Sequence, residues 1–296
     1  MMAVIELRSA FQRYMEEHGL VISELPLDDG QIHRVHVDGD KHGTRNGWYV
    51  LYTDGFPAGA FGSWRVGSTG TWSARAPETM TATERVEYSD RLRRMRQQRE
   101  AEVERRQQQT AIAAKKLWNK STNANPLHPY LIRKKIRPHH LRQVGDTLLV
   151  PLIDADGEIW NLQRIFPDGT KRFLAHGRVK GCFALFGPLD GDSVYVCEGM
   201  ATGATVHQHS GLPTVCAMNA GNLLAVCTAL TDQVGKITIC ADNDRQTGGN
   251  PGITKGREAA AAVGASLTWP ESCGNGCRCS DFNDIAQCER AQEVAA

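Results

Sequence analysis

The sequence has no cysteine before Cys182, and five of its nine cysteines stand singly in apolar stretches. These five are Cys182, Cys197, Cys216, Cys227 and Cys240. Isolated cysteines of this kind behave as small buried hydrophobic residues, which favours a reducing compartment over a disulfide-stabilised secreted protein. No apolar run approaches the length of a membrane span, and the charged, amphipathic start differs from a secretory signal. The sequence therefore predicts a cytoplasmic protein that does not associate with membranes.

An excess of charge of one sign is also missing. The formal net charge is only +1, so a nucleic-acid partner would have to bind a local patch. Residues 78–118 contain neither glycine nor proline and few apolar residues, which predicts a long polar helix, a charged linker over 77–120. Arginines outnumber acids there, so guidance of DNA along this helix is the alternative interpretation.

The first part of the chain, residues 1–76, has the pattern of a small α+β domain. Apolar residues at helical spacing over 4–18 end at Gly19, and short β-like runs separated by glycine turns follow between residues 32 and 72. Aromatic side chains in such a domain usually form its core, although they could also stack on nucleotide bases.

The strongest basic patch lies within residues 121–190. Residues 127–142 contain no acid and carry five cations: Arg133, Lys134, Lys135, Arg137 and Arg142. Such a cluster attracts polyanions, and it is equally compatible with a solvated surface. Strand-like runs over 147–153 and 158–166 follow, so we expect a basic α+β subdomain here.

Residues 191–296 alternate between short apolar runs and helical patterns. The expected strands cover 193–197, 213–218, 236–241 and 265–269, and the expected helices cover 200–209, a segment capped by Asn222, 252–263 and a last helix from about Phe282. This alternation predicts an α/β fold with an open, mostly parallel sheet and helices on both faces. In such sheets the functional residues follow the carboxyl ends of the strands.

Acidic residues stand at two of these strand ends. Glu198 follows the first strand, and Asp242 and Asp244 follow the third, so the three carboxylates should meet at one edge of the sheet. Such a cluster requires a cation, and ligands that are all oxygen favour Mg²⁺ or Mn²⁺ over zinc. An ion between carboxylates and phosphates indicates phosphoryl transfer or hydrolysis. The alternative is that Asp242 and Asp244 only cap the next helix.

The motifs around these acids resemble those of a known family. EGMATG at 198–203 is similar to the E-G-Y-A-T-A motif of primases from conjugative plasmids and satellite phages. Two later segments, GNPGITKGREAA at 249–260 and DFND at 281–284, are also similar to segments of those primases. KRFLAHGRVKGCFALFG at 171–187 resembles the basic subdomain of replicative primases. Over about residues 127–290 the chain thus resembles the TOPRIM-type DNA primases. Their signature, one Glu after the first strand and a D-x-D after the third, is matched by Glu198, Asp242 and Asp244.

The resemblance implies a primase that makes short RNA primers on single-stranded DNA from NTPs, for a plasmid, phage or other mobile element. Asp242 and Asp244 would hold the metal ion against the triphosphate, and Glu198 would deprotonate or orient the attacking 3′-hydroxyl. Met200 and Gly203 depart from the motif, replacing its tyrosine and its last alanine. No cysteine-rich zinc ribbon precedes the catalytic region and no P-loop occurs, so a separate helicase or initiator protein is expected as a partner.

Further residues are candidates for the same site. Asp281 and Asp284 could hold a second ion or cap the last helix. The expected nucleotide- and template-binding cations are Arg164, Lys171, Arg172, Lys180 and Lys255, with Arg133, Lys134, Lys135 and Arg137 guiding the template. Lys180 matches the Lys-Gly of the family. Zinc could bind at Cys273, Cys277, Cys279 and Cys288, but structural zinc sites usually have C-x2-C spacing, so thiols without a metal are expected instead.

Two other functions stay open. A TOPRIM nuclease would use the same acids and ion to activate water, and the primase-type flanking motifs argue against it. A non-catalytic adaptor that binds single-stranded DNA would use the basic patch and leave the acids idle, and the presence of all three acids argues against that.

Overall fold

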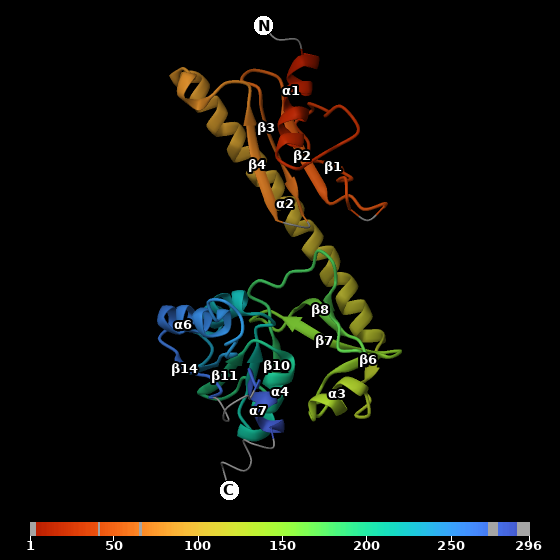
Figure 1. The fold of residues 1–296 in the computed structure, drawn as a ribbon, viewed down its shortest axis with the longest axis vertical. Coiled ribbons are helices and arrows are strands. Elements are labelled where there is room, and N and C mark those ends of the chain that lie inside the picture. Colours follow the sequence, from red (N-terminus) through yellow and green to blue (C-terminus); the bar gives the residue numbers. More distant parts are fainter. Residues whose placement is uncertain (1–3, 41, 65–66, 272–277, 289–296) are drawn as a thin grey trace. The chain divides into compact units, whose positions relative to one another are not determined.

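The computed structural model describes residues 4–40, 42–64, 67–271 and 278–288. The chain divides into two compact units, Met1–Glu104 and Arg105–Ala296. The long helix α2 (Ala82–Lys120) contributes its first part to the first unit and its last part to the second (Figure 1). None of the described helices combines the length and the apolar character required to cross a lipid bilayer.

The first unit is an antiparallel sheet with a helix on each face. Its four strands pair in chain order: β1 (His33–Val35), β2 (Gly47–Tyr52), β3 (Ala58–Ser63) and β4 (Ser68–Ser73). Helix α1 (Val4–Glu17) covers one face, and α2, which follows the short 3-10 helix η1 (Pro77–Thr79), covers the other. This arrangement agrees with the small α+β domain and the long helix that the sequence predicts.

Aromatic residues form the core of this unit. The ring centroid of Phe11 lies 6.2 Å from that of Tyr49, 6.0 Å from that of Phe61 and 5.5 Å from that of Trp72. Edge-to-face and tilted pairs at these distances stabilise a core beyond the area they bury. On the opposite face Met95 of α2 is buried in a second cluster. The long helix is therefore not solvated on all sides.

The second unit begins with another antiparallel sheet. Its strands pair in the order β5 (Thr122–Asn123), β6 (Arg142–Val144), β7 (Thr147–Ile153), β8 (Ile159–Ile165) and β9 (Lys171–Phe173). Tyr130 and Leu131 of α3 (Pro129–Lys134) are buried against one face, in a cluster that also contains Ile165. Ala114, in the last part of α2, packs on the other face with Leu149.

The rest of the second unit is a mostly parallel sheet. Its strand order is β10 (Ala184–Phe186), β12 (Thr214–Cys216), β11 (Ser193–Cys197), β13 (Lys236–Cys240) and β14 (Ser266–Thr268), with only β10 antiparallel to its neighbour. One face packs against α4 (Met200–Ser210) and α7 (Phe282–Gln287). The other packs against α5 (Leu223–Leu230), which follows the 3-10 helix η2 (Ala220–Asn222), and α6 (Pro251–Val263). The prediction of an α/β fold for this segment is confirmed.

The five isolated cysteines are all buried, as the sequence predicts. Burial raises the pKa of the Cys182 thiol to about 11 and the pKa of Cys227 and of Cys240 to about 12. A thiol that stays protonated at neutral pH is a poor nucleophile and a poor metal ligand. These side chains therefore act as small apolar core residues.

Candidate active site

The two central strands of the parallel sheet bring the first two predicted acids to one edge. β11 and β13 are neighbours, and Cys197 at the end of one pairs with Cys240 at the end of the other. Glu198 follows the first of these residues directly, and Asp242 lies two positions after the second. The backbone N–H of Asp242 lies near enough to the Glu198 carboxylate to lower the pKa of that group. The parallel register therefore places both carboxyl groups at the carboxyl edge of the sheet.

Both carboxyl groups are held in an environment that disfavours their negative charge. The pKa of Glu198 is raised to about 7, mainly by burial, with repulsion from the charge of Asp244 contributing to the same rise. Burial raises the pKa of Asp242 to about 8, with added repulsion from Glu198 and the nearby aspartates. Among the described residues, Glu198 Oε1 and Asp242 Oδ1 are buried with no hydrogen-bond partner. Buried acceptors without partners are costly, and a cation would satisfy both.

Asp242 and Asp244 do not cap the following helix. Helix α6 begins only at Pro251, and Asn250 occupies its N-cap position. The Asn250 side chain instead accepts a hydrogen bond from the backbone N–H of Asp244 at 2.9 Å. The capping interpretation of the D-x-D is therefore wrong, and the two carboxylates are available to other ligands.

A glycine allows α6 to begin close to the acids. A Cβ atom on Gly252 would lie 2.3 Å from the carbonyl oxygen of Asp242 and 2.8 Å from Glu198 Oε1. Any larger residue would push the helix away from the strand ends. The start of α6, which carries unpaired backbone N–H groups and a positive dipole end, therefore lies against the carboxylates.

The two later acids belong to the same electrostatic environment. The Asp281 side chain accepts a hydrogen bond from the backbone N–H of Asp284 at 2.7 Å and so caps α7, which was one of its two expected roles. Burial also raises the pKa of Asp281. Asp284 pairs with Lys134 at 3.4 Å. Both aspartates raise the pKa of Asp242, so they lie near enough to influence an ion bound there.

Helix α7 is fixed by an asparagine that the sequence did not single out. Asn283 is 1% exposed, and its Nδ2 donates to the carbonyl oxygen of Lys134 at 2.7 Å and to Thr205 Oγ1 at 2.8 Å. These bonds join α7 to α3 and α4. Lys134, expected to guide the template, thus also holds the acidic segment in place.

The loop that carries Lys180 is anchored at the acidic edge by Asn222. The Nδ2 atom of Asn222 lies 3.0 Å from the carbonyl oxygen of Val179, 2.9 Å from that of Cys182 and 2.8 Å from that of Ala217. Its Oδ1 accepts a hydrogen bond from the N–H of Gly181 at 2.8 Å. The N–H of Ala217 in turn donates to the carbonyl oxygen of Cys197, next to Glu198, at 2.8 Å. The predicted helix cap at Asn222 makes no side-chain capping bond; its side chain positions this loop instead.

The other predicted cations do not lie on one face. Arg164 on β8 and Arg172 on β9 are opposite each other in the strand register. Their side chains belong to the sheet face where Leu149 packs against the last part of α2. Lys171 belongs to the opposite face, with its Nζ 5.5 Å from the ring centroid of Tyr130.

The remaining cations are dispersed. The Arg133 guanidinium lies 5.6 Å from the centroid of the Tyr130 ring, the same ring that Lys171 contacts. Lys255 pairs with Glu258 on α6 at 2.7 Å. Lys135 and Arg137 are exposed. The predicted cations are thus distributed over the two faces of the antiparallel sheet and helix α6.

The proposed zinc ligands are only partly within the described residues. Cys273 and Cys277 lie outside them, and Cys279 and Cys288 are partly buried. Within the described parts of the chain, no three His, Cys, Asp or Glu side chains are grouped so that they could enclose a metal ion. Mg²⁺ keeps several waters and commonly uses one or two carboxylates. The unpartnered oxygens of Glu198 and Asp242 fit that mode of binding.

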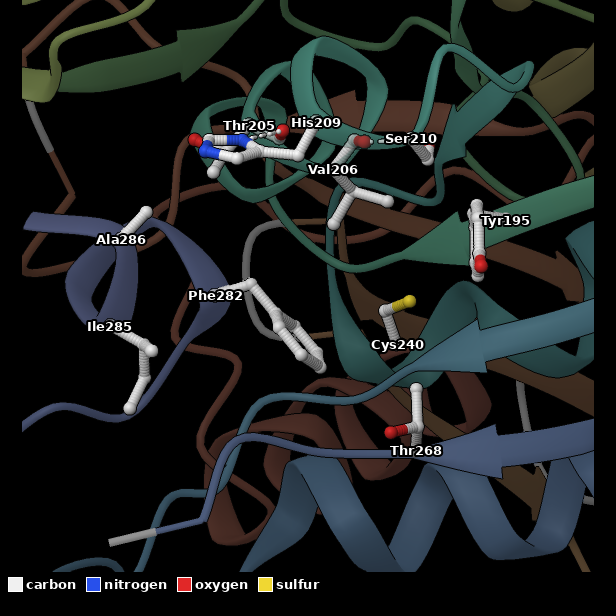
Figure 2. A pocket seen from close by; sticks show the side chains of 10 residues that line it. All are labelled: Tyr195, Thr205, Val206, His209, Ser210, Cys240, Thr268, Phe282, Ile285 and Ala286. Carbon is white, nitrogen blue, oxygen red and sulfur yellow. Dashed lines mark hydrogen bonds between the residues drawn. The ribbon is translucent and has the colours of Figure 1, made fainter. Parts of the chain in front are cut away.

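A largely apolar pocket of about 490 Å³ lies on the sheet face that α4 and α7 cover (Figure 2). Figure 2 shows Phe282 extending from α7 toward the strands, with Val206 on α4 and Cys240 on β13 around the same space. The lining contains none of the predicted acids. The polar edge and this pocket are therefore separate features.

Comparisons with known proteins agree with this geometry. Residues 193–291 match the family model described as the Toprim domain. This segment is a Toprim domain. Toprim domains generally use divalent metal ions, in keeping with the buried, unpartnered carboxylate oxygens at the sheet edge. The matched segment extends from the start of β11 past the end of α7 and contains every predicted acid.

The chain is also related to Toprim-domain DNA primases. It is 34% identical over 279 residues to "DNA primase TraC" of Escherichia coli, an alignment that covers 88% of this chain and 26% of that protein. The primase fragment of the bacteriophage T7 primase-helicase protein is similar with a TM-score of 0.42 and 20% identity, over 56% of this chain and 72% of that one. A DnaG primase catalytic domain bound to single-stranded DNA gives a TM-score of 0.36 and 15% identity, over 56% of each chain. The chain thus spans about a quarter of the length of its TraC relative.

Proposed function

We propose that this chain is a DNA primase that makes short RNA primers on single-stranded DNA by metal-dependent nucleotidyl transfer. One observation carries the proposal. Two buried carboxyl groups, Glu198 and Asp242, meet at the carboxyl edge of a Toprim sheet, each with an oxygen that has no partner among the described residues. The relationship to TraC primase supplies the reaction class.

The residues fit the requirements of phosphoryl transfer, which are mainly positioning and charge neutralisation. A bound Mg²⁺ or Mn²⁺ would neutralise the carboxylates and the phosphate charge that develops during transfer. Asp242 and Asp244 would hold that ion, with Asp281 and Asp284 adding negative charge nearby. Glu198, with its pKa of about 7, has the proton affinity expected of a group that accepts the proton of the attacking 3′-hydroxyl.

Partners and location follow from the reaction. The proposed substrates are NTPs and a single-stranded DNA template. The proposed template contacts include Lys180, whose neighbour Gly181 donates a backbone hydrogen bond to Asn222. We also propose that the protein works with a separate helicase or initiator of a plasmid, phage or other mobile element. The proposed location is the cytoplasm, which the isolated, buried cysteines also favour.

The deciding experiment is a primer-synthesis assay. The protein is incubated with single-stranded DNA, labelled NTPs and Mg²⁺, beside the variant Glu198→Gln and the matched control Glu258→Gln. Glu258 is an exposed residue of α6 that pairs with Lys255. We expect labelled primers from the native protein and from Glu258→Gln, and none from Glu198→Gln.

Other outcomes identify the rival functions. Cleavage of the template that depends on Glu198, without synthesis, would show a nuclease in which water replaces the sugar hydroxyl. Binding of the template without synthesis or cleavage, unchanged in Glu198→Gln, would show a non-catalytic adaptor.

A further inference from the structure

A buried asparagine separates the two acids of the D-x-D. Asn243 is 7% exposed, whereas Asp242 and Asp244 on either side of it are half-buried. The Asn243 Nδ2 donates a hydrogen bond to the carbonyl oxygen of Pro270 at 3.0 Å, and its Oδ1 accepts one from Asn250 Nδ2 at 2.9 Å. Both ends of this amide are engaged within the protein, so Asn243 can act on a ligand only through its neighbours.

Asn250 extends this network to the start of α6. Its Oδ1 accepts a hydrogen bond from the backbone N–H of Asp244 at 2.9 Å, while its Nδ2 donates to Asn243. Its carbonyl oxygen accepts the N–H of Thr254 at 3.0 Å, in the first turn of the helix. The backbone of Asn250 has a φ of 42°, a left-handed conformation that asparagine adopts more readily than most residues. Asn250 therefore fixes the backbone of Asp244 relative to α6.

The backbone of Asn243 connects the D-x-D to the second acidic segment. Its N–H donates to the carbonyl oxygen of Ser280 at 2.6 Å, and Ser280 directly precedes Asp281. The charge of Asp281 contributes to the raised pKa of Asp242, so the two acids lie close enough to repel each other. Through its N–H and its side chain, Asn243 thus holds together the segments that follow β13, follow β14 and precede α7.

The network fixes the acids without neutralising them. Amides carry no charge, so these bonds leave the negative charge of the edge available to a cation. A guanidinium partner acts differently: Arg91 donates to Asp54 in the first unit and lowers the pKa of that aspartate. Mg²⁺ demands near-ideal octahedral geometry, and carboxylates that repel one another keep such a geometry only when their backbone is held. Holding it in advance lowers the cost of ordering the site around the ion.

We propose that Asn243 and Asn250 are positioning residues that hold Asp242 and Asp244 in the arrangement that binds a divalent ion. The inference rests on the proposed function and deepens it, because it assigns the geometry of the metal site to two uncharged side chains that bind no substrate themselves.

Binding of Mn²⁺ to the full chain tests the inference without requiring synthesis. Electron paramagnetic resonance of free Mn²⁺ gives the Kd for the native protein, for Asn243→Ala and for Asn250→Gly. Glycine removes the amide of Asn250 and still adopts the left-handed backbone. We expect each variant to raise the Kd about 10- to 100-fold, the usual effect of removing a group that orients a metal ligand.

Asn161→Ala is the matched control for a buried asparagine. Asn161 is 0% exposed, and its Oδ1 accepts hydrogen bonds from the backbone N–H groups of Leu162 at 2.8 Å and Leu174 at 3.2 Å, in the antiparallel sheet. We expect this variant to be less stable in urea and to bind Mn²⁺ like the native protein. An equal rise of the Kd in Asn161→Ala, or an unchanged Kd in either Asn243→Ala or Asn250→Gly, would overturn the inference.

The double variant Asn243→Ala Asn250→Gly shows whether the two amides act as one unit. Residues of a single hydrogen-bond network have non-additive effects, so we expect the double variant to bind Mn²⁺ about as weakly as the weaker single variant. A loss equal to the product of the two single losses would show independent effects and contradict the network.

The concentration of Mg²⁺ separates positioning from catalysis. Asn243→Ala keeps every carboxylate, so high Mg²⁺ should restore its initial rate of primer synthesis, whereas Glu198→Gln should stay inactive. A rate in Asn243→Ala that stays low at saturating Mg²⁺ would contradict a role through the metal site.

The inference and the proposed function can fail separately. Primer synthesis by a protein whose Asn243→Ala variant binds Mn²⁺ normally would retain the primase and remove the positioning role. Mn²⁺ binding that depends on both asparagines, in a chain that makes no primers, would retain the positioning role and remove the primase.

Discussion

The antiparallel sheet of the first unit and the parallel sheet of the second are both covered by helices on two faces, yet their acids behave in opposite ways. In the first unit Asp29 bonds to His33 and Asp54 pairs with Arg91, and these hydrogen bonds lower the pKa of each aspartate. In the second unit burial raises the pKa of Glu198 and of Asp242. Parallel strands deliver all their carboxyl ends to one edge, so acids that follow different strands are forced together there. The parallel direction of the strands, rather than the number of acids, therefore brings Glu198 and Asp242 together.

The largest expected effect separates the two kinds of acid. Asp242→Asn removes a charge from the crowded edge, and we expect primer synthesis to fall by at least about 100-fold, as for the loss of other groups that stabilise transition-state charge. Asp54→Asn removes an aspartate that already has a partner, and synthesis should stay within about twofold of native. Initial rates at saturating NTP measure both. Equal losses in the two variants would contradict the contrast between the sheets.

Glycine substitutions extend the comparison to backbone packing. An added Cβ would overlap Asp242 and Glu198 at Gly252, and would lie 2.8 Å from the Phe11 ring at Gly59. Overpacking should lower the free energy of unfolding by about 1–3 kcal/mol in both alanine variants, measured by urea titration. Only Gly252→Ala should also reduce synthesis, by about 10- to 100-fold, because it displaces the acids. Gly248→Ala, with no neighbour within 4 Å, is the control, and a loss of synthesis in Gly59→Ala would contradict the prediction.

Substitution of Asn222 tests whether DNA binding depends on the loop that carries Lys180, which Asn222 anchors through its side chain. Asn222→Ala leaves several buried carbonyl groups without a donor, so the free energy of unfolding should fall by about 1–3 kcal/mol. Binding of single-stranded DNA should weaken as it does in Lys180→Ala, with a salt dependence reduced by about one ion. Asn219→Ala, whose side chain makes no capping bond, should change neither quantity. Native DNA binding in a folded Asn222→Ala protein would show that the loop does not contact the template.

The smallest expected effect is a dependence of stability on pH that only the parallel sheet produces. A carboxyl group with a raised pKa in the folded protein stabilises the fold below its ordinary pKa, and this contribution is lost as the pH rises through the folded pKa. For Glu198 this stabilisation is lost between its ordinary pKa of 4.5 and its folded pKa of about 7. For Asp242 it is lost between 3.8 and about 8. The melting temperature without metal should therefore fall between about pH 4 and about pH 8. Added Mg²⁺ should raise the melting temperature more above that range than below it.

The double variant Glu198→Gln Asp242→Asn is the control for this titration. It should show a flatter pH profile and little response to Mg²⁺, because neither side chain can ionise. A native-like profile in that variant would assign the pH dependence to other groups.

Local patterns predicted the elements of the second unit closely. The strand and helix expected at 193–197 and 200–209 were observed at Ser193–Cys197 and Met200–Ser210, because apolar periodicity and glycine stops act over short distances. The same reasoning was wrong where a residue's partner is distant in sequence. Asn222 occupies a cap position, but its side chain bonds to residues 179–182, some forty positions earlier. No local pattern contains such a partner.

The sequence by itself determined the order of the elements, the acids that follow strands, and the family motifs, since each of these is written in neighbouring residues. Tertiary structure alone decided which strand ends are neighbours, how deeply Glu198 and Asp242 are buried, and that the predicted cations fall on different faces. Those properties depend on strand order and register, which join segments far apart in the chain. The pKa of a carboxyl group follows its surroundings, and folding is what assembles them.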